Sequence, residues 1–174
     1  PMLPRRAPAV GLMNELRQKP HVLVVDDMSI CLRVAVKMMT SLGCTCDTAS
    51  NGHEALAVLR KDPSSFDMVL MDLRMPLMDG IEATGLLRKD TALKDIPVAV
   101  FTAEELNEED VVAMGFDTIV NKPASKHRLS SALDSLVLNV VSQRLHNPRT
   151  PSVARRPSQE DAPLPRSPST PASP

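Results

Sequence analysis

Hydrophobic positions between residues 20 and 145 follow two alternating patterns. Short, continuous apolar runs are separated by longer segments in which apolar residues recur every three or four positions. The runs predict strands that are buried on both faces, and the longer segments predict amphipathic helices. The predicted strands are His21–Val25, Cys44–Ala49, Phe66–Met71, Pro97–Phe101 and Thr118–Asn121.

The segments between and after these runs predict five helices. They span approximately residues 30–42, 51–61, 80–89, 107–114 and 125–143. Gly43 suits the C-terminal cap of the first helix, because glycine readily adopts the left-handed backbone that ends many helices. In the first helix the residues at one-face spacing are Ile30, Cys31, Val34, Ala35, Met38 and Leu42, and in the last they are Leu129, Leu133, Leu136, Val137 and Val140.

Strict alternation of strand and helix predicts an α/β fold with a parallel sheet covered on both faces. Right-handed crossovers place the carboxyl ends of all five strands at one edge of such a sheet. We take the strand order 2-1-3-4-5 from flavodoxin-like doubly wound folds, since these residues alone do not determine it. The expected architecture is therefore (βα)5.

The two ends of the chain differ in composition from the segment between them. Residues 1–19 combine proline with small and basic residues, and residues 146–174 are rich in proline, serine and arginine. Neither stretch has enough apolar material to pack, so we expect a flexible leader and a disordered tail. With 174 residues, the chain has room for one domain of ordinary size, which we assign to residues 20–145.

Charge and hydropathy restrict the classes of partner. Lys and Arg number 20 and Asp and Glu 21, for a net charge of −1, so no overall field attracts nucleic acid or an anionic membrane. No window approaches the roughly 20 apolar residues that a membrane span needs. We expect a cytoplasmic protein, with a nuclear location also compatible. The chain begins at Pro1, which suggests a processed, cloned or incomplete start.

The three cysteines, Cys31, Cys44 and Cys46, are odd in number and lack the spacing of a zinc site. We interpret them as reduced structural thiols, with a redox role as the alternative.

Polar residues occur at the carboxyl ends of four predicted strands. Asp26 and Asp27 follow the first strand, Asp72 the third, Thr102 the fourth and Lys122 the fifth. These side chains should converge at one edge of the sheet. A carboxylate-rich site without Cys or His suits Mg²⁺, which prefers oxygen ligands and leaves room for a phosphate.

Such a site can transfer a phosphoryl group. Asp72 would attack phosphorus as a carboxylate nucleophile, while Lys122 offsets charge and Thr102 donates a hydrogen bond. Each residue alone has a structural reading: Asp26 and Asp27 or Thr102 as helix caps, Lys122 as a solvated lysine and Asp72 as a turn residue. Their joint occurrence at strand ends favours the functional interpretation.

Four segments, VLVVDD, LMDLRMPLMDGIEA, VFTAEE and VNKP, resemble the receiver domains of response regulators and hybrid histidine kinases over about residues 20–143. The resemblance implies that Asp27 and Asp72 bind Mg²⁺ directly, Asp26 through water, and the backbone carbonyl of Arg74 as a third ligand. It also implies that Asp72 takes phosphate from a histidine kinase or a histidine phosphotransfer protein, and that the Lys122-Pro123 bond is cis. Such a domain promotes only its own phosphorylation and dephosphorylation, so it is not an enzyme in the ordinary sense.

The sequence departs from the family in two places. Ile119 occupies a position that is often aromatic in the family, and the interval from Thr102 to Lys122 is about two residues shorter than usual. The shortening falls on the fourth helix. That helix belongs to the face, formed with strand five and helix five, through which we expect a downstream protein effector to bind.

Two alternative interpretations lack a residue that they require, and a third remains open. A phosphatase of the haloacid dehalogenase type needs a second aspartate where Arg74 lies, and a dinucleotide-binding domain needs a glycine-rich first turn. A receiver-like module that binds partners without phosphorylation is the main rival, and the chain could be the C-terminal part of a hybrid kinase. In the tail, Ser158, Ser167 and Thr170 lie in kinase-target contexts, with a solubilising linker as the alternative.

Overall fold

The computed structural model describes residues 19–146, with side chains described as far as residue 136. Strands and helices alternate strictly in this part of the chain, as predicted. The strands are β1 His21–Val25, β2 Thr45–Ala49, β3 Met68–Asp72, β4 Val98–Thr102 and β5 Thr118–Asn121. The helices are α2 Ser29–Ser41, α3 Gly52–Lys61, α4 Gly80–Lys89, α5 Glu108–Ala113 and α6 Lys126–His146.

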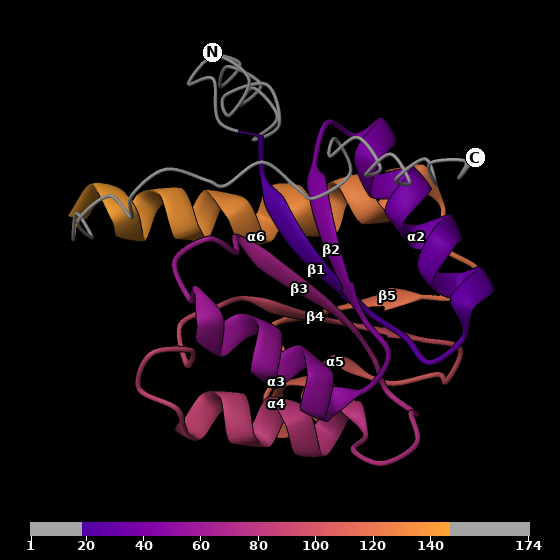
Figure 1. Ribbon diagram of the computed structural model, residues 1–174. Coiled ribbons are helices and arrows are strands. Elements are labelled where there is room, and N and C mark those ends of the chain that lie inside the picture. The colour runs from indigo at the N-terminus through magenta and orange to yellow at the C-terminus, as the bar shows by residue number, and fades with distance from the viewer. Residues whose placement is uncertain (1–18, 147–174) are drawn as a thin grey trace, which may run out of the picture.

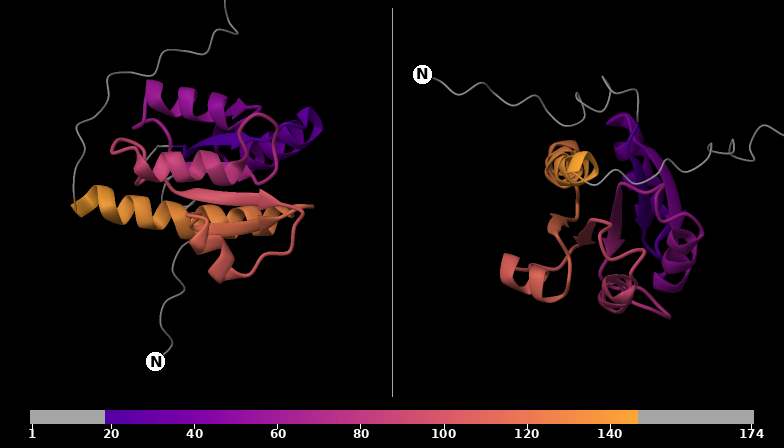
Figure 2. Two further views of the ribbon diagram at one scale, coloured as in Figure 1. Left: turned by 90° about the horizontal axis from the view of Figure 1, so that it is seen from below. Right: turned by 90° about the vertical axis from the view of Figure 1, so that its left-hand side faces the viewer.

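The five strands form one parallel sheet in the order β2-β1-β3-β4-β5, which confirms the predicted fold class and strand order. Helices cover both faces: α3, α4 and α5 lie on one, and α2 and α6 on the other (Figures 1 and 2). All strand carboxyl ends therefore meet at one edge.

Residues of β1 alternate between two apolar cores. Leu23 and Val25 pack on the side of α3 and α4, whereas Val22 and Val24 pack on the side of α2 and α6. Because both faces are covered, every residue of β3 and β4 is buried. This burial explains why the strands are apolar runs rather than alternating patterns.

The exposed face of α2 differs from the predicted stripe. Ile30 and Val34 are 63% and 52% exposed, while Ala35 and Met39 are buried. The helix packs on β1, β2 and α6, and its two buried residues lie four positions apart. The buried face is therefore narrower than the face that the six apolar residues at one-face spacing would cover. Ile30 and Val34 therefore share the apolar spacing of this helix but face solvent.

Several element boundaries follow from local capping. Gly43 has a φ of 91° and donates its N–H to the Thr40 carbonyl at 2.9 Å, so it ends α2 as predicted. The side chains of Asn51, Asp79 and Asn107 accept a backbone N–H at the starts of α3, α4 and α5. These caps fix where each helix begins.

All three cysteines are free thiols. Burial raises the pKa of Cys44 to about 12 and that of Cys46 to about 11. Both thiols stay protonated and unreactive near neutral pH, as a structural role requires.

Some expectations concern residues outside the described part of the chain. They are the leader before residue 19, the tail after residue 146 with Ser158, Ser167 and Thr170, and the side chains of Val137 and Val140. Between residues 19 and 146, no helix combines the length and apolar character that crossing a membrane requires.

Candidate functional site

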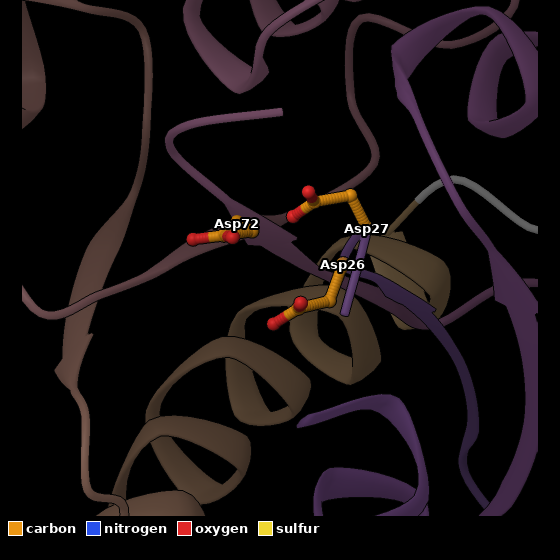
Figure 3. Close-up of side chains that lie close together, drawn as sticks. All are labelled: Asp26, Asp27 and Asp72. Carbon is orange, nitrogen blue, oxygen red and sulfur yellow. The ribbon is translucent and has the colours of Figure 1, made fainter. Parts of the chain in front are cut away.

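Three carboxylates meet at the carboxyl edge of the sheet. Asp26 and Asp27 directly follow β1, and Asp72 is the last residue of β3, which pairs with β1. One carboxylate oxygen from each lies within 4.8 Å of the others (Figure 3). The edge predicted from strand ends thus brings these three side chains together.

Burial differs strongly among the three. Asp26 is fully buried and Asp72 is 8% exposed, whereas Asp27 is open to solvent. Asp27 is therefore the carboxylate of the three that is open to solvent, and Asp26 and Asp72 lie buried beside it.

Lys122, which follows β5, supplies the positive charge at this edge. Its Nζ donates to Asp26 Oδ2 at 2.6 Å and lies 3.0 Å from Asp72 Oδ1, over the ring of Phe101 at 4.8 Å. Burial lowers the pKa of Lys122, but hydrogen bonds to Asp26 and Asp72 outweigh it and leave the pKa above its ordinary value. The lysine is therefore a half-buried, ion-paired cation, and the peptide bond to Pro123 is cis.

The pKa of Asp72 is raised, mainly by burial and further by the charge of Asp26. The hydrogen bond with Lys122 and a 2.8 Å bond from the Leu73 N–H act in the opposite direction. A second cation beside Asp72 would favour the ionised carboxylate, which is the nucleophilic form.

The oxygens of Asp26 already have partners. Oδ1 accepts the N–H of Met28 at 2.9 Å, and Oδ2 accepts from Lys122. Asp26 thus bonds to the backbone ahead of α2, although the N-cap residue of that helix is Met28 and makes no side-chain cap.

Thr102 ends β4 and is 2% exposed. Its Oγ1 accepts the N–H of Glu104 at 3.1 Å, while the cap of the next helix is Asn107. Thr102 is therefore not a helix cap, and its hydroxyl hydrogen is free to point towards an incoming group.

One interaction near this edge was not predicted from the sequence, whereas a second residue, Gly80, was expected to shape the loop after Asp72. Glu104 pairs with the Arg74 side chain, where only the Arg74 carbonyl was predicted to matter. At Gly80 an added Cβ would meet the Asp72 carbonyl oxygen. The Asp79-Gly80 dipeptide was a signal for a tight loop, whereas nothing in the sequence indicated the ion pair.

Ile119 is partly buried against the core on the side of α3, α4 and α5. This aliphatic side chain therefore fills the place where an aromatic residue was expected from the family resemblance.

The donor set fits Mg²⁺. It consists of carboxylate oxygens within 4.8 Å of one another, without sulfur or imidazole, and one of the carboxylates is open to solvent. Receiver domains bind Mg²⁺ at an acidic pocket of this kind, and these aspartates could hold it.

Comparison with protein families and curated proteins gives a consistent result. A family model described as the response regulator receiver domain matches residues 22–134. Transcription factor SKN7 of Chaetomium thermophilum is 33% identical over 119 residues, covering 67% of this chain. Histidine kinase 5 of Arabidopsis thaliana is 34% identical over 143 residues, covering 66%. The chain spans 15% of the length of each of these two relatives.

Solved structures share the fold. The chemotaxis protein CheY4 of Vibrio cholerae gives a TM-score of 0.62 at 28% identity, covering 68% of this chain and 98% of that one. The receiver domain of a Pseudomonas aeruginosa sensor histidine kinase gives 0.63 at 25% identity, with the same two coverages. That structure was solved with a magnesium ion coordinated in its active-site cleft.

Proposed function

We propose that Asp72 is the phosphoacceptor of this chain, which belongs to the response regulator receiver domain family. Receiver domains of this family act in phosphorelay signalling, and the relatives include histidine kinases and two-component regulators. The observation that carries the proposal is the contact of Lys122 with both Asp26 and Asp72, beside Asp27.

Asp27, Asp72 and the backbone carbonyl of Arg74 would hold Mg²⁺ directly, and Asp26 would act through water. The geometry supports this division, because Asp26 is fully buried with both oxygens bonded, while Asp27 is open to solvent. Mg²⁺ in this place would offset negative charge on the phosphoryl oxygens.

The proposed reaction is the transfer of a phosphoryl group from a phosphohistidine. A carboxylate oxygen of Asp72 forms the new bond to phosphorus, and the phosphorus–nitrogen bond breaks. The electron pair of that bond goes to the imidazole nitrogen, and the product is an aspartyl phosphate. Lys122 pairs with the phosphoryl oxygens, and Thr102 donates a hydrogen bond to one of them.

The donor is proposed to be a histidine kinase or a histidine phosphotransfer protein. We place the receiver domain in residues 20–145, in an intracellular protein, with a downstream effector on the face formed by α5, β5 and α6. Because Ile119 lies where the family often has an aromatic residue, this face must respond to phosphorylation through shifts of the backbone rather than through a rotamer change of an aromatic ring. The chain would act either alone or as part of a longer signalling protein.

Beryllofluoride with Mg²⁺, which mimics an aspartyl phosphate, tests the phosphoacceptor. We expect NMR shift changes at the β1, β3 and β4 ends in the wild type and none in Asp72→Asn. Asp110→Asn, on the surface of α5, is the matched control and should respond like the wild type. A wild type that does not respond would instead support a module that binds partners without phosphorylation.

A further inference from the structure

Arg74 and Glu104 form an ion pair between the two loops that flank Asp72 and Thr102. Arg74 Nε lies 2.7 Å from Glu104 Oε1, and Nη2 lies 3.4 Å from Oε2. Each residue follows the end of its strand by two positions, and β3 and β4 are neighbours in the sheet. The pair therefore joins the loop that follows Asp72 to the loop that follows Thr102.

This ion pair is largely in solvent, with side chains 68% and 41% exposed. Exposed pairs contribute little to the free energy of unfolding. The two-point contact nevertheless restricts the loop conformations, because a guanidinium and a carboxylate match in a single plane. Its consequence should therefore be local rather than global.

The backbone of Glu104 connects this pair to the site. Its N–H donates to Thr102 Oγ1 at 3.1 Å. A hydroxyl has one hydrogen to donate and two lone pairs, so occupying one lone pair limits its rotation and leaves the hydrogen for another acceptor. The orientation of the Thr102 hydroxyl thus depends on where the Glu104 turn is held.

The backbone of Arg74 lies on the other side of the same space. Its carbonyl is the proposed third ligand of the metal, and the preceding residue, Leu73, accepts the N–H of Gly80 at 3.0 Å. The ion pair consequently links the metal side of the site to the hydroxyl side.

We infer that Arg74 and Glu104 are positioning residues, whose ion pair holds the Glu104 turn so that Thr102 donates to the phosphoryl group on Asp72. The inference rests on the proposed function, because Thr102 has this task only if Asp72 is phosphorylated. It adds a route from the site to the loop before α5 that does not use position 119.

The test measures the affinity for beryllofluoride at saturating Mg²⁺. Arg74→Ala and Glu104→Ala should each weaken the affinity by about two- to fivefold, the range expected for losing an exposed pair. The exchanged pair, Arg74→Glu with Glu104→Arg, should recover most of the loss. Arg60→Ala breaks another exposed pair, with Asp90, and should leave the affinity unchanged.

A background of Thr102→Ala separates positioning from general stabilisation. There, Glu104→Ala should cause no further loss of affinity; an equal loss would show that Glu104 does not act through Thr102 and would overturn the inference. If the wild type binds beryllofluoride and both single variants bind it with the same affinity as the wild type, the inference is overturned but the proposed function is not. A wild type that does not bind it would remove the proposed function as well.

Discussion

The Thr84 side chain lies in the middle of α4 and is fully buried. Its hydroxyl is the buried side-chain polar atom that has no hydrogen-bond partner within the described residues. An unsatisfied buried hydroxyl costs about 1–3 kcal/mol. Thr84→Val removes the hydroxyl with little change of volume, so we expect the free energy of unfolding in urea to rise by about 1 kcal/mol.

Thr45→Val is the matched control for that substitution. The Thr45 hydroxyl is 2.7 Å from His21 Nδ1, so its loss should lower the free energy of unfolding instead. If both variants were destabilised alike, the Thr84 hydroxyl would have a partner in solution.

Residues at strand ends could be predicted because their positions depend only on where apolar runs stop. Asp26, Asp72 and Lys122 were found in this way, and the structure brings them into contact. The partner of Glu104 could not be predicted, because it depends on how two loops fold towards each other.

Arg88 is a second residue whose contacts could not be predicted. In the sequence it is an ordinary basic residue near a helix end, but in the structure its guanidinium donates hydrogen bonds to the carbonyls of Lys94, Ile96 and Gly115 and to the Asp117 carboxylate.

At the scale of elements, the start of α4 is packed directly against β3. Gly80 is the first residue of α4, and a Cβ there would clash with the carbonyl oxygen of Asp72. Gly80→Ala must therefore push the loop between β3 and α4 away from the site. We expect a loss of about 1–3 kcal/mol in the free energy of unfolding, as in other overpacked sites, and weaker binding of beryllofluoride.

Gly85 lies in the same helix and provides the control. A Cβ at Gly85 meets nothing within 4 Å, so Gly85→Ala should stabilise the protein by about 1 kcal/mol and leave ligand binding unchanged. Urea unfolding and beryllofluoride titration of both variants would check the pair. Equal behaviour of the two substitutions would contradict a specific contact at Gly80.

The existence of the strands and helices and their succession along the chain could be predicted from periodicity. Their first and last residues and their exposed faces could not. The third strand was expected at Phe66–Met71 and lies at Met68–Asp72. The apolar spacing of α2 extended over Ile30 and Val34, which face solvent. Spacing reports which residues share a helix face, whereas the width of the face that becomes buried depends on the neighbouring elements.

At the scale of the whole molecule, the site exists only through the strand order. Asp26 and Lys122 are 96 positions apart in sequence, and they meet because β1 and β5 end at the same edge. Alternation of strands and helices predicts such an edge, but several strand orders satisfy that alternation. The order 2-1-3-4-5 could be anticipated only from known folds, because no pairwise strand contact is encoded in the apolar runs.

The same convergence leads us to expect that the stability of the whole domain depends on Mg²⁺. The three carboxylates, with ligand oxygens within 4.8 Å of one another, could hold a cation in the folded chain and are separated on unfolding. A ligand that binds only the folded state raises the free energy of unfolding, by about 1.4 kcal/mol at tenfold its dissociation constant. We expect this rise in urea unfolding when MgCl₂ replaces NaCl at equal ionic strength. Asp27→Asn, at the exposed ligand, should remove most of the increment, and a wild type equally stable in both salts would show that the carboxylates do not bind the ion.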